Sequence, residues 1–283
     1  MRNRLLVLLL PLAARALRHA FLAMPRSRSG FFARVLIAVV LAGPGIVRAD
    51  LPEIIDRVKP SVVVVGTHQL TRSPPFVMRG TGFAVGDGRL VATNHHVIQA
   101  AIDEAGGERL VVVARVTGST MQQRAARIVA VDNVHDLALL RIDGPALPVL
   151  SLDEADAVRE GQSVAFTGFP IGAVLGLSPV THRGIISAIT PIAVPAANAR
   201  QINARVVQQI RSGAFDIYQL DATAYPGNSG GPLFELNHGQ VIGLLNMVFV
   251  KESKESMLSK PSGISFAIPV RFLRELIARG ASP

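Results

Sequence analysis

The alternation of hydrophobic and polar residues along the chain indicates short β-strands over most of its length. Eight segments are rich in Val and Ile and have the length of single strands, with turn-forming residues such as 86–88 and 237–239 between them. The predicted strands cover residues 61–66, 81–85, 110–116, 127–131, 163–167, 184–190, 217–220 and 240–250. This pattern predicts an all-β fold.

Helical patterns are expected at the two ends of the strand-rich region. Asp50 is a suitable N-cap for a short first helix, and Glu53 stands at the position that would complete a capping box. Near the C-terminus, apolar residues recur at helical spacing before Gly280, which predicts an amphipathic last helix. Its apolar face would contain Phe272, Leu273, Leu276 and Ile277.

Residues 1–49 have the composition of a targeting segment. They hold eight arginines and no acidic residue, and a basic stretch ending at Arg34 precedes an apolar run at 35–41. Val47 and Ala49 are small residues at the offsets that a signal peptidase requires, so the sequence predicts an exported protein cleaved before Asp50.

The start of this segment allows two interpretations. Two apolar runs are present, at 5–14 and 35–42, and each is shorter than the roughly 20 residues that a membrane-spanning helix needs. Met24 would begin a compact signal peptide with its own basic region, which makes it the favoured start. The alternative is a longer two-part leader or a retained anchor, and an uncleaved leader would then be the only attachment to a membrane.

The net charge gives no support for a nucleic-acid partner. The whole chain has 29 basic and 20 acidic residues, which gives a formal charge of +9, but eight of the basic residues lie in 1–49. The remainder therefore has 21 basic and 20 acidic residues. A nucleic-acid-binding domain would need a basic face on its folded part. The chain has no cysteine, which neither indicates nor excludes an oxidising compartment.

The candidate chemistry begins at Ser229, which stands in a glycine-rich run at 227–231. Glycines on both sides let the backbone turn sharply and direct N–H groups to a point beside the hydroxyl, as a nucleophile with an oxyanion hole requires. The run alone also fits an ordinary glycine-rich turn with a solvated serine. The presence of a base and an orienting acid elsewhere in the chain would favour the nucleophile over the ordinary turn.

The chain order of the histidines and acids favours the nucleophile. An α/β-hydrolase needs an acid and then a histidine after its serine, and no Asp follows Ser229. Upstream, the segments 93–97 and 135–140 supply a His and then an Asp in strand-like surroundings. The order His, Asp, Ser is that of chymotrypsin-like proteases.

These segments resemble the motifs of the bacterial HtrA/Deg group of trypsin-like serine proteases. Thr-Asn-x-His-Val matches at 93–97, Asp-Leu-Ala-Leu at 136–139, Gly-Asn-Ser-Gly-Gly at 227–231, and the Gly-Phe-Ala-Ile-Pro-like strand only in part at 263–269. The likeness covers roughly residues 51–280. It implies one protease domain at 50–283, built from two six-stranded antiparallel β-barrels. We expect no PDZ domain, because only three residues follow Gly280.

The resemblance implies a catalytic triad of His96, Asp136 and Ser229. The family's base is the fourth residue of Thr-Asn-x-His, so His95 takes the variable position and is expected to have no proton-transfer role. Asp132 is the other candidate acid, but only Asp136 leads directly into an apolar strand, where a triad acid must be buried.

Two residues near the triad acid are expected to have no catalytic part. His135 is interpreted as a bystander, and Asp143 as a turn residue before Gly144. The oxyanion hole is assigned to the backbone of Gly227, Asn228 and Ser229, with the N–H groups of the first and last as donors.

The specificity pocket is predicted from the residues beside the nucleophile. In trypsin-like enzymes the residue six before the serine lies at the pocket base, which here is Thr223, followed by Ala224. Ser265 stands where the family usually has Gly, on the wall strand. Asp221 is interpreted as structural. Without an acid in the pocket, a Lys or Arg side chain would lose its water without compensation, so we expect cleavage after small or medium aliphatic residues.

Two further segments depart from the strand pattern. Ile202, Val206 and Ile210 recur at helical spacing within 196–211, which predicts a surface helix in a long connection. Residues 251–262 are polar and charged and are expected to form a loop near the substrate cleft.

The sequence therefore predicts a periplasmic or secreted serine endopeptidase that acts on polypeptides, and the resemblance implies a role in quality control of envelope proteins. It is expected to need no cofactor and no metal, and the resemblance leaves room for a homo-oligomer. The alternative is a catalytically silent peptide-binding or chaperone-like protein on the same fold. Reaction with a fluorophosphonate would separate them, because only an activated serine reacts.

Overall fold

Sixteen helices and strands make up the described part of the chain. The computed structural model describes residues 50–99, 105–117, 120–170, 176–192, 215–246 and 263–280. The helical elements are α3 (Leu51–Val58), the 3-10 helix η1 (Lys59–Ser61), α4 (His95–Ile98) and α8 (Val270–Gly280). The strands are β1 (Val62–His68), β2 (Phe76–Val85), β3 (Leu90–Asn94), β4 (Arg109–Thr117), β5 (Thr120–Asp132), β6 (Leu137–Ile142), β7 (Ser163–Gly168), β8 (Val180–Pro191), β9 (Asp216–Asp221), β10 (Pro232–Glu235), β11 (Val241–Asn246) and β12 (Ile264–Pro269).

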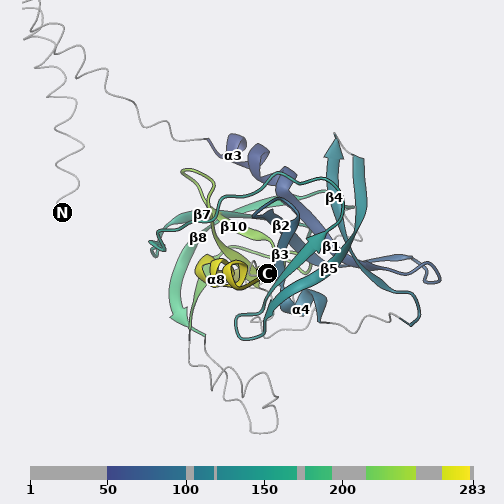
Figure 1. Cartoon of the computed structure of the whole chain (residues 1–283). Coiled ribbons are helices and arrows are strands. Elements are labelled where there is room, and N and C mark those ends of the chain that lie inside the picture. The colour runs from purple at the N-terminus through teal and green to yellow at the C-terminus, as the bar shows by residue number, and fades with distance from the viewer. Residues whose placement is uncertain are drawn as a thin grey trace, which may run out of the picture. The chain divides into compact units, whose positions relative to one another are not determined.

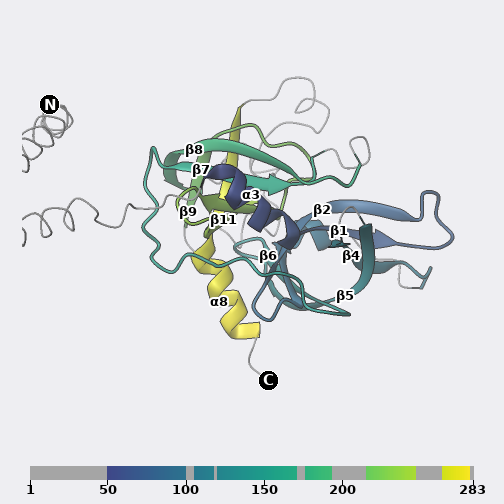
Figure 2. The same ribbon diagram turned by 90° about the horizontal axis from the view of Figure 1, so that it is seen from above.

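The twelve strands form two closed antiparallel barrels of six strands each. The order around the first barrel is β1-β2-β3-β6-β5-β4, and that around the second is β10-β11-β12-β9-β8-β7. Figure 1 shows the strands of the first barrel beside those of the second, and in Figure 2 the two groups lie side by side. A closed barrel pairs every strand on both edges and leaves no backbone edge exposed. The predicted fold class is confirmed.

Each barrel has its own apolar core, and a third cluster joins the two barrels. Val63, Val91 and Leu140 belong to the core of the first barrel, while Phe166 and Leu220 belong to that of the second. The joining cluster contains side chains of β3, β6, β10 and β11 together with residues of α3 and α8. Burial of these apolar side chains therefore fixes the position of one barrel relative to the other. A site formed between the barrels depends on this fixed position.

The first helix starts as predicted, but its cap differs from the predicted capping box. Asp50 is the N-cap of α3, and its carboxylate accepts a hydrogen bond from the Leu51 N–H at 2.8 Å. Residue N2 is Pro52, which has no N–H to donate. Among the described residues, no hydrogen bond joins Glu53 to Asp50, so the box is not formed. The last helix has the predicted apolar face, with Phe272, Leu273 and Leu276 buried and Ile277 packed against the same cluster.

The eight predicted strand segments all overlap strands of the structure, and residues 247–250 of the last segment lie outside the described residues. The short strands β3 and β10 were not predicted as separate strands, and β5 is longer than predicted because its first half is mostly exposed and polar. The helix expected at 196–211, the loop expected at 251–262 and the leader at 1–49 lie outside the described residues. In the described ranges no helix is long and apolar enough to cross a membrane.

Candidate active site

His96 lies where strand β3 of the first barrel passes into the single helical turn α4. β3 is buried along its whole length and ends at Asn94. Val97 and Ile98, which follow His96 in the turn, are buried in the core of the first barrel. Because these two side chains anchor the turn, the packing of the barrel fixes the position of the histidine.

Asp136 lies in the turn immediately before β6, the strand that pairs with β3. The register pairs Asn94 with Leu137, so the end of one strand meets the beginning of the other. The backbone of Asp136 has φ 56°, a left-handed conformation that costs a residue with a Cβ about 1–2 kcal/mol. Its carbonyl accepts hydrogen bonds from Asn94 Nδ2 at 3.1 Å and from the His95 N–H at 3.0 Å, which stabilise this conformation.

The carboxylate of Asp136 holds His96 by its backbone and by its ring. The His96 N–H donates to Oδ1 at 2.9 Å, and His96 Nδ1 lies 2.6 Å from Oδ2. Asp136 is buried, so little water competes for these bonds. Because Nδ1 faces the carboxylate, Nε2 is the ring nitrogen left to exchange a proton with another group.

Asn246 completes the surroundings of this carboxylate and was missed from the sequence. It is the last residue of β11 in the second barrel, is fully buried, and donates from Nδ2 to Asp136 Oδ2 at 2.6 Å. The sequence carried a signal for it, since one asparagine interrupts the apolar run at 241–250. A buried amide in a core strand needs a hydrogen-bond partner.

Ser229 lies in the connection between β9 and β10, and two of its neighbouring glycines have conformations that other residues adopt at a cost. Gly227 has φ 104° and Gly230 has φ 84°. A Cβ added at Gly227 would come within 2.3 Å of the carbonyl oxygen of Phe169, and one at Gly230 within 2.2 Å of that of Thr81. The glycines are therefore required both for the turn and for the close approach of other backbone.

Hydrogen bonds from both barrels fix the backbone on either side of the nucleophile. The Thr81 N–H, in β2, donates to the carbonyl of Ser229 at 2.8 Å, and the Gly230 N–H donates to that of Leu245, in β11, at 2.9 Å. Ser229 therefore lies at the seam. Its carbonyl oxygen and the side chain of Val97 both lie close to Gly80 of β2. Within the described ranges, no hydrogen bond joins the hydroxyl of Ser229 to the ring of His96. Such bonds are often long in the free state of an enzyme.

The three residues assigned to the oxyanion hole differ in how their N–H groups are used. The Asn228 N–H donates to the carbonyl of Tyr225 at 3.0 Å, whereas the N–H groups of Gly227 and Ser229 make no backbone hydrogen bond within the described part. Two unengaged donors on either side of a turn suit an anion that develops during reaction. The side-chain amide of Asn228 is buried without a hydrogen-bond partner among the described residues.

Thr223, Ala224 and Ser265 lie together, and the hydroxyl of Ser265 is turned towards backbone. It accepts a hydrogen bond from the Ala224 N–H at 3.0 Å and donates one to the carbonyl of Ala222 at 2.7 Å. Ser265 is fully buried, Ala224 is buried and Thr223 is half-buried. The serine at this position therefore fixes the segment before the nucleophile, and the assignment of the three residues to a specificity pocket stays a prediction.

Asp132 and His135, which are not assigned to the triad, form a separate cluster. Asp132 Oδ2 lies 2.9 Å from His135 Nδ1 and accepts a hydrogen bond from Arg279 at 2.8 Å. Burial raises the pKa of Asp132, but the hydrogen bonds from His135 and Arg279 outweigh it and hold this pKa well below its usual value. The ring of His135 stacks on Phe272 of α8 at 3.8 Å between centroids. Both groups are thus engaged away from His96.

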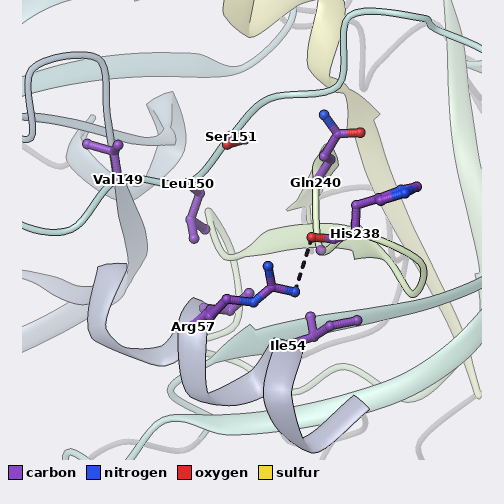
Figure 3. A pocket seen from close by; sticks show the side chains of 9 residues that line it. Ile54, Arg57, Val149, Leu150, Ser151, His238 and Gln240 are labelled. Carbon is purple, nitrogen blue, oxygen red and sulfur yellow. Dashed lines mark hydrogen bonds between the residues drawn. The ribbon is translucent and has the colours of Figure 1, made fainter. Parts of the chain in front are cut away.

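A separate cavity of about 410 Å³ lies between α3 and the turn that joins β10 to β11. Figure 3 shows Arg57 pointing across it towards His238, whose carbonyl accepts a hydrogen bond from Arg57 Nη2 at 3.4 Å. None of the predicted catalytic residues lines this cavity. Among the described residues, no group of His, Cys, Asp and Glu side chains is arranged to hold a metal ion.

Comparison with known proteins places the chain beside trypsin-like proteases. Residues 80–244 match the family described as the trypsin-like peptidase domain. The chain is 32% identical over 195 residues to a probable periplasmic serine endoprotease DegP-like of Halomonas elongata, covering 68% of this chain and 32% of the relative. It is 32% identical over 238 residues to the mitochondrial serine protease HTRA2 of Bos taurus, covering 81% of this chain and 43% of the relative. The chain thus spans less than half the length of these relatives.

Solved structures of proteases of the same type share the fold. The structure of Deg5 superimposes with a TM-score of 0.57 at 26% identity, covering 79% of this chain and 90% of that one. The serine endoprotease from Yersinia pestis gives a TM-score of 0.57 at 26% identity, covering 83% of this chain and 67% of the other.

Proposed function

The chain belongs to the trypsin-like peptidase family, as an HtrA/Deg-like serine protease, and from this premise we propose that it is an exported endopeptidase that hydrolyses polypeptides with a triad of His96, Asp136 and Ser229. The observation that carries the proposal is the 2.6 Å contact between His96 Nδ1 and Asp136 Oδ2. It fixes the imidazole through Nδ1, which leaves Nε2 for proton exchange, at the seam where the backbone of Ser229 is held from both barrels.

The proposed reaction follows from these positions. His96 Nε2 takes the proton of the Ser229 hydroxyl as Oγ attacks the carbonyl carbon of a peptide bond, and Asp136 stabilises the imidazolium that forms. The N–H groups of Gly227 and Ser229 donate to the oxyanion of the tetrahedral intermediate. His96 then gives its proton to the leaving amine, and the acyl-enzyme is hydrolysed by water activated in the same way.

Labelling with a fluorophosphonate, together with hydrolysis of casein, tests the proposal. The wild-type protein should react at Ser229 and degrade casein, and both signals should disappear in Ser229→Ala. His96→Ala should be equally inactive in hydrolysis, while His95→Ala should lose little. A folded wild-type protein that neither labels nor hydrolyses would instead support the catalytically silent, peptide-binding function. Activity in His96→Ala with loss in His95→Ala would show that the histidine assignment is wrong by one residue.

The compartment and the substrates are part of the same proposal. Relatives named as periplasmic endoproteases support a periplasmic or secreted location, in agreement with the leader at 1–49. Misfolded or exposed envelope proteins are the proposed substrates. N-terminal sequencing of the protein from the periplasmic fraction should find Asp50 as the first residue, whether translation starts at Met1 or at Met24. A membrane-bound product that keeps residues 31–49 would favour a retained anchor.

A further inference from the structure

We infer that Thr81, in the first barrel, is a positioning residue for the oxyanion hole, because its hydroxyl holds the backbone from which Gly227 directs its N–H. This inference rests on the proposed function, in which Gly227 and Ser229 stabilise the oxyanion. Thr81 is fully buried in β2, and it contacts the turn of the nucleophile from the opposite barrel. None of the four sequence motifs contains it.

All three polar groups of Thr81 are used at the seam between the barrels. Its N–H donates to the carbonyl of Ser229 at 2.8 Å, and its hydroxyl donates to the carbonyl of Gly227 at 2.6 Å. Its own carbonyl accepts from the hydroxyl of Thr93 at 2.7 Å. Thr93 belongs to β3, the strand that ends two residues before His96. Thr81 therefore connects both ends of the Gly227–Ser229 turn to the strand that positions the base.

The direction of the Thr81 hydroxyl is itself fixed. The N–H of Phe169, in the second barrel, donates to Thr81 Oγ1 at 3.1 Å. The hydroxyl oxygen accepts the bond from Phe169, and its proton remains available for the Gly227 carbonyl, so the two bonds are compatible. Together they use the hydroxyl's one donor and one of its two acceptor sites. A short bond of this kind, buried in a low-dielectric seam, resists exchange with water.

The peptide units around the turn show why this one hydroxyl matters. The unit between Asn228 and Ser229 is fixed by its carbonyl, which accepts from the Gly231 N–H at 2.9 Å, so the direction of the Ser229 N–H is set. The unit between Pro226 and Gly227 has no such bond, because no hydrogen bond reaches the Pro226 carbonyl within the described ranges. Its N–H is held only through Gly227, the residue that it shares with the following peptide unit, between Gly227 and Asn228.

Rotation of the backbone at Gly227 is what could turn its N–H away from the oxyanion. A glycine populates positive and negative φ about equally, so it does not by itself keep φ at 104°. The next unit is held at two points, by Thr81 at the Gly227 carbonyl and by the carbonyl of Tyr225 at the Asn228 N–H. Without the hydroxyl, one of these points is lost and the unanchored unit before Gly227 gains freedom to turn its N–H away from the oxyanion.

Three substitutions made in the full-length protein test this role. Thr81→Val replaces the hydroxyl by a methyl group of the same shape, and Thr81→Ser keeps the hydroxyl while removing the methyl group. The matched control is Thr167→Val. Thr167 is also fully buried in a strand, and its hydroxyl bonds to that of Thr181 at 2.8 Å rather than to the backbone of the Gly227–Ser229 turn. Thermal unfolding followed by circular dichroism reports whether each variant is folded.

The readouts separate positioning from general stability. For Thr81→Val we expect kcat on a fluorogenic peptide to fall by about 10- to 100-fold with little change in KM, since losing an oxyanion donor outright costs roughly 10²–10³ in rate. Inhibition by a peptide aldehyde, whose adduct places an oxyanion in the hole, should weaken in the same proportion. Binding of a product peptide, which forms no oxyanion, should not weaken. Thr81→Ser and Thr167→Val should stay within about threefold of the wild type in kcat, because a small effect of this size is expected from packing alone.

Each result supports or overturns the inference. It is overturned if Thr81→Val keeps its kcat, if Thr167→Val loses as much, or if folded Thr81→Ser is inactive. Should Thr81→Val fail to fold, Thr81→Ala takes its place and must show the same proportional loss of kcat and of aldehyde inhibition. A wild-type protein without activity or labelling would refute the proposed function instead, so the two failures are distinguishable.

Discussion

Asn246 of the second barrel donates a hydrogen bond to Oδ2 of Asp136 in the first, with 2.6 Å between the two atoms. Both residues are buried, and the same oxygen lies 2.6 Å from His96 Nδ1. The acid of the proposed triad is therefore held from both barrels. A carboxylate with two donors on one oxygen cannot rotate without losing both bonds.

Replacing Asn246 should lower kcat even in variants that remain folded. In Asn246→Ala the carboxylate of Asp136 loses a buried donor, and we expect kcat on casein-derived peptides to fall by about 10- to 100-fold, in line with a lost charged hydrogen bond of about 1.5–3 kcal/mol. Asn246→Asp should be worse, since it places a second carboxylate beside the first. Kinetics of the purified, folded variants decide this, and an unchanged kcat in Asn246→Ala would show that Asp136 needs no support from the second barrel.

Two nearby acids should respond differently to the same substitution. Asp136→Asn should lower kcat by about 10⁴, because an amide no longer fixes the required tautomer of His96. Asp132→Asn removes the partner of His135 and Arg279 and should lower the free energy of unfolding by roughly 1–3 kcal/mol, with kcat largely kept. Casein hydrolysis and circular dichroism melts compare the two. A loss of 10⁴ in Asp132→Asn would move the triad acid to that position.

The strands and the order of the catalytic candidates could be predicted because they depend on local patterns. Alternation of Val and Ile marks a strand wherever its neighbours lie, and the runs around His96, Asp136 and Ser229 are contiguous in sequence. β3 and β10 were harder to predict, since a strand of four or five wholly buried residues has no alternation to show.

The supporting residues could not be predicted because they act across the seam. Thr81 and Asn246 lie in strands whose patterns resemble any other buried strand, and their partners are 146 and 110 residues away in the chain. The role of Ser265 was open for the same reason: only the fold shows that its hydroxyl bonds to the backbone at 222 and 224. The difference at Asp50 is local, since Pro52 removes one of the donors that an N-cap would otherwise use.

Gly227→Ala should be destabilising and inactive. Alanine at φ 104° is strained, and its Cβ would come within 2.3 Å of the Phe169 carbonyl oxygen, so the turn has to move. Gly107→Ala is the matched control, because Gly107 has φ 81° with nothing within 4 Å of an added Cβ. It should cost about 1–2 kcal/mol of stability from its conformation alone and keep its activity. Melting curves and fluorophosphonate labelling measure both effects, and normal labelling of Gly227→Ala would contradict the required geometry of the turn.

The stability of the fold should decrease below neutral pH in a way that depends on His182. Burial lowers the pKa of this histidine below 6.5, and its ring stacks on Phe166 with 5.0 Å between centroids. The unfolded chain then takes up a proton at about pH 6.5, and the folded chain does so only at lower pH. Between these values the unfolded state binds more protons, so the free energy of unfolding falls as the pH falls.

His182→Phe should flatten this dependence while keeping the ring stack. Melting temperatures measured from pH 8 to pH 5 should decrease less steeply in His182→Phe than in the wild type. His238→Phe, at an exposed histidine, is measured alongside, to show what replacing a histidine by phenylalanine does to the melting temperature in itself. If the melting temperature depends on pH equally steeply in His182→Phe and the wild type, His182 is not the cause of the pH dependence.

Cleavage specificity depends on the segment that Ser265 fixes. Thr223 and Ala224 bring no charge to the predicted pocket, so Lys and Arg side chains would enter it without a counter-charge, and we expect cleavage after Val, Ala or Leu with weak activity after Arg, Lys or Phe. Mass spectrometry of the products of denatured casein gives the preference directly. A dominant preference for Arg or Lys would show that the pocket is elsewhere.

Removing the Ser265 side chain should broaden this preference. Ser265→Gly loses both hydrogen bonds to the segment 222–224 and also vacates space on the wall strand, so bulkier residues should be accepted and KM for small ones should rise. Ser187→Ala is the control: Ser187 is exposed on β8, and its hydroxyl donates to the carbonyl of Gln219 on β9 at 3.0 Å. Its cleavage profile should match that of the wild type. If Ser265→Gly also keeps the wild-type profile, the 222–224 segment does not form the pocket wall.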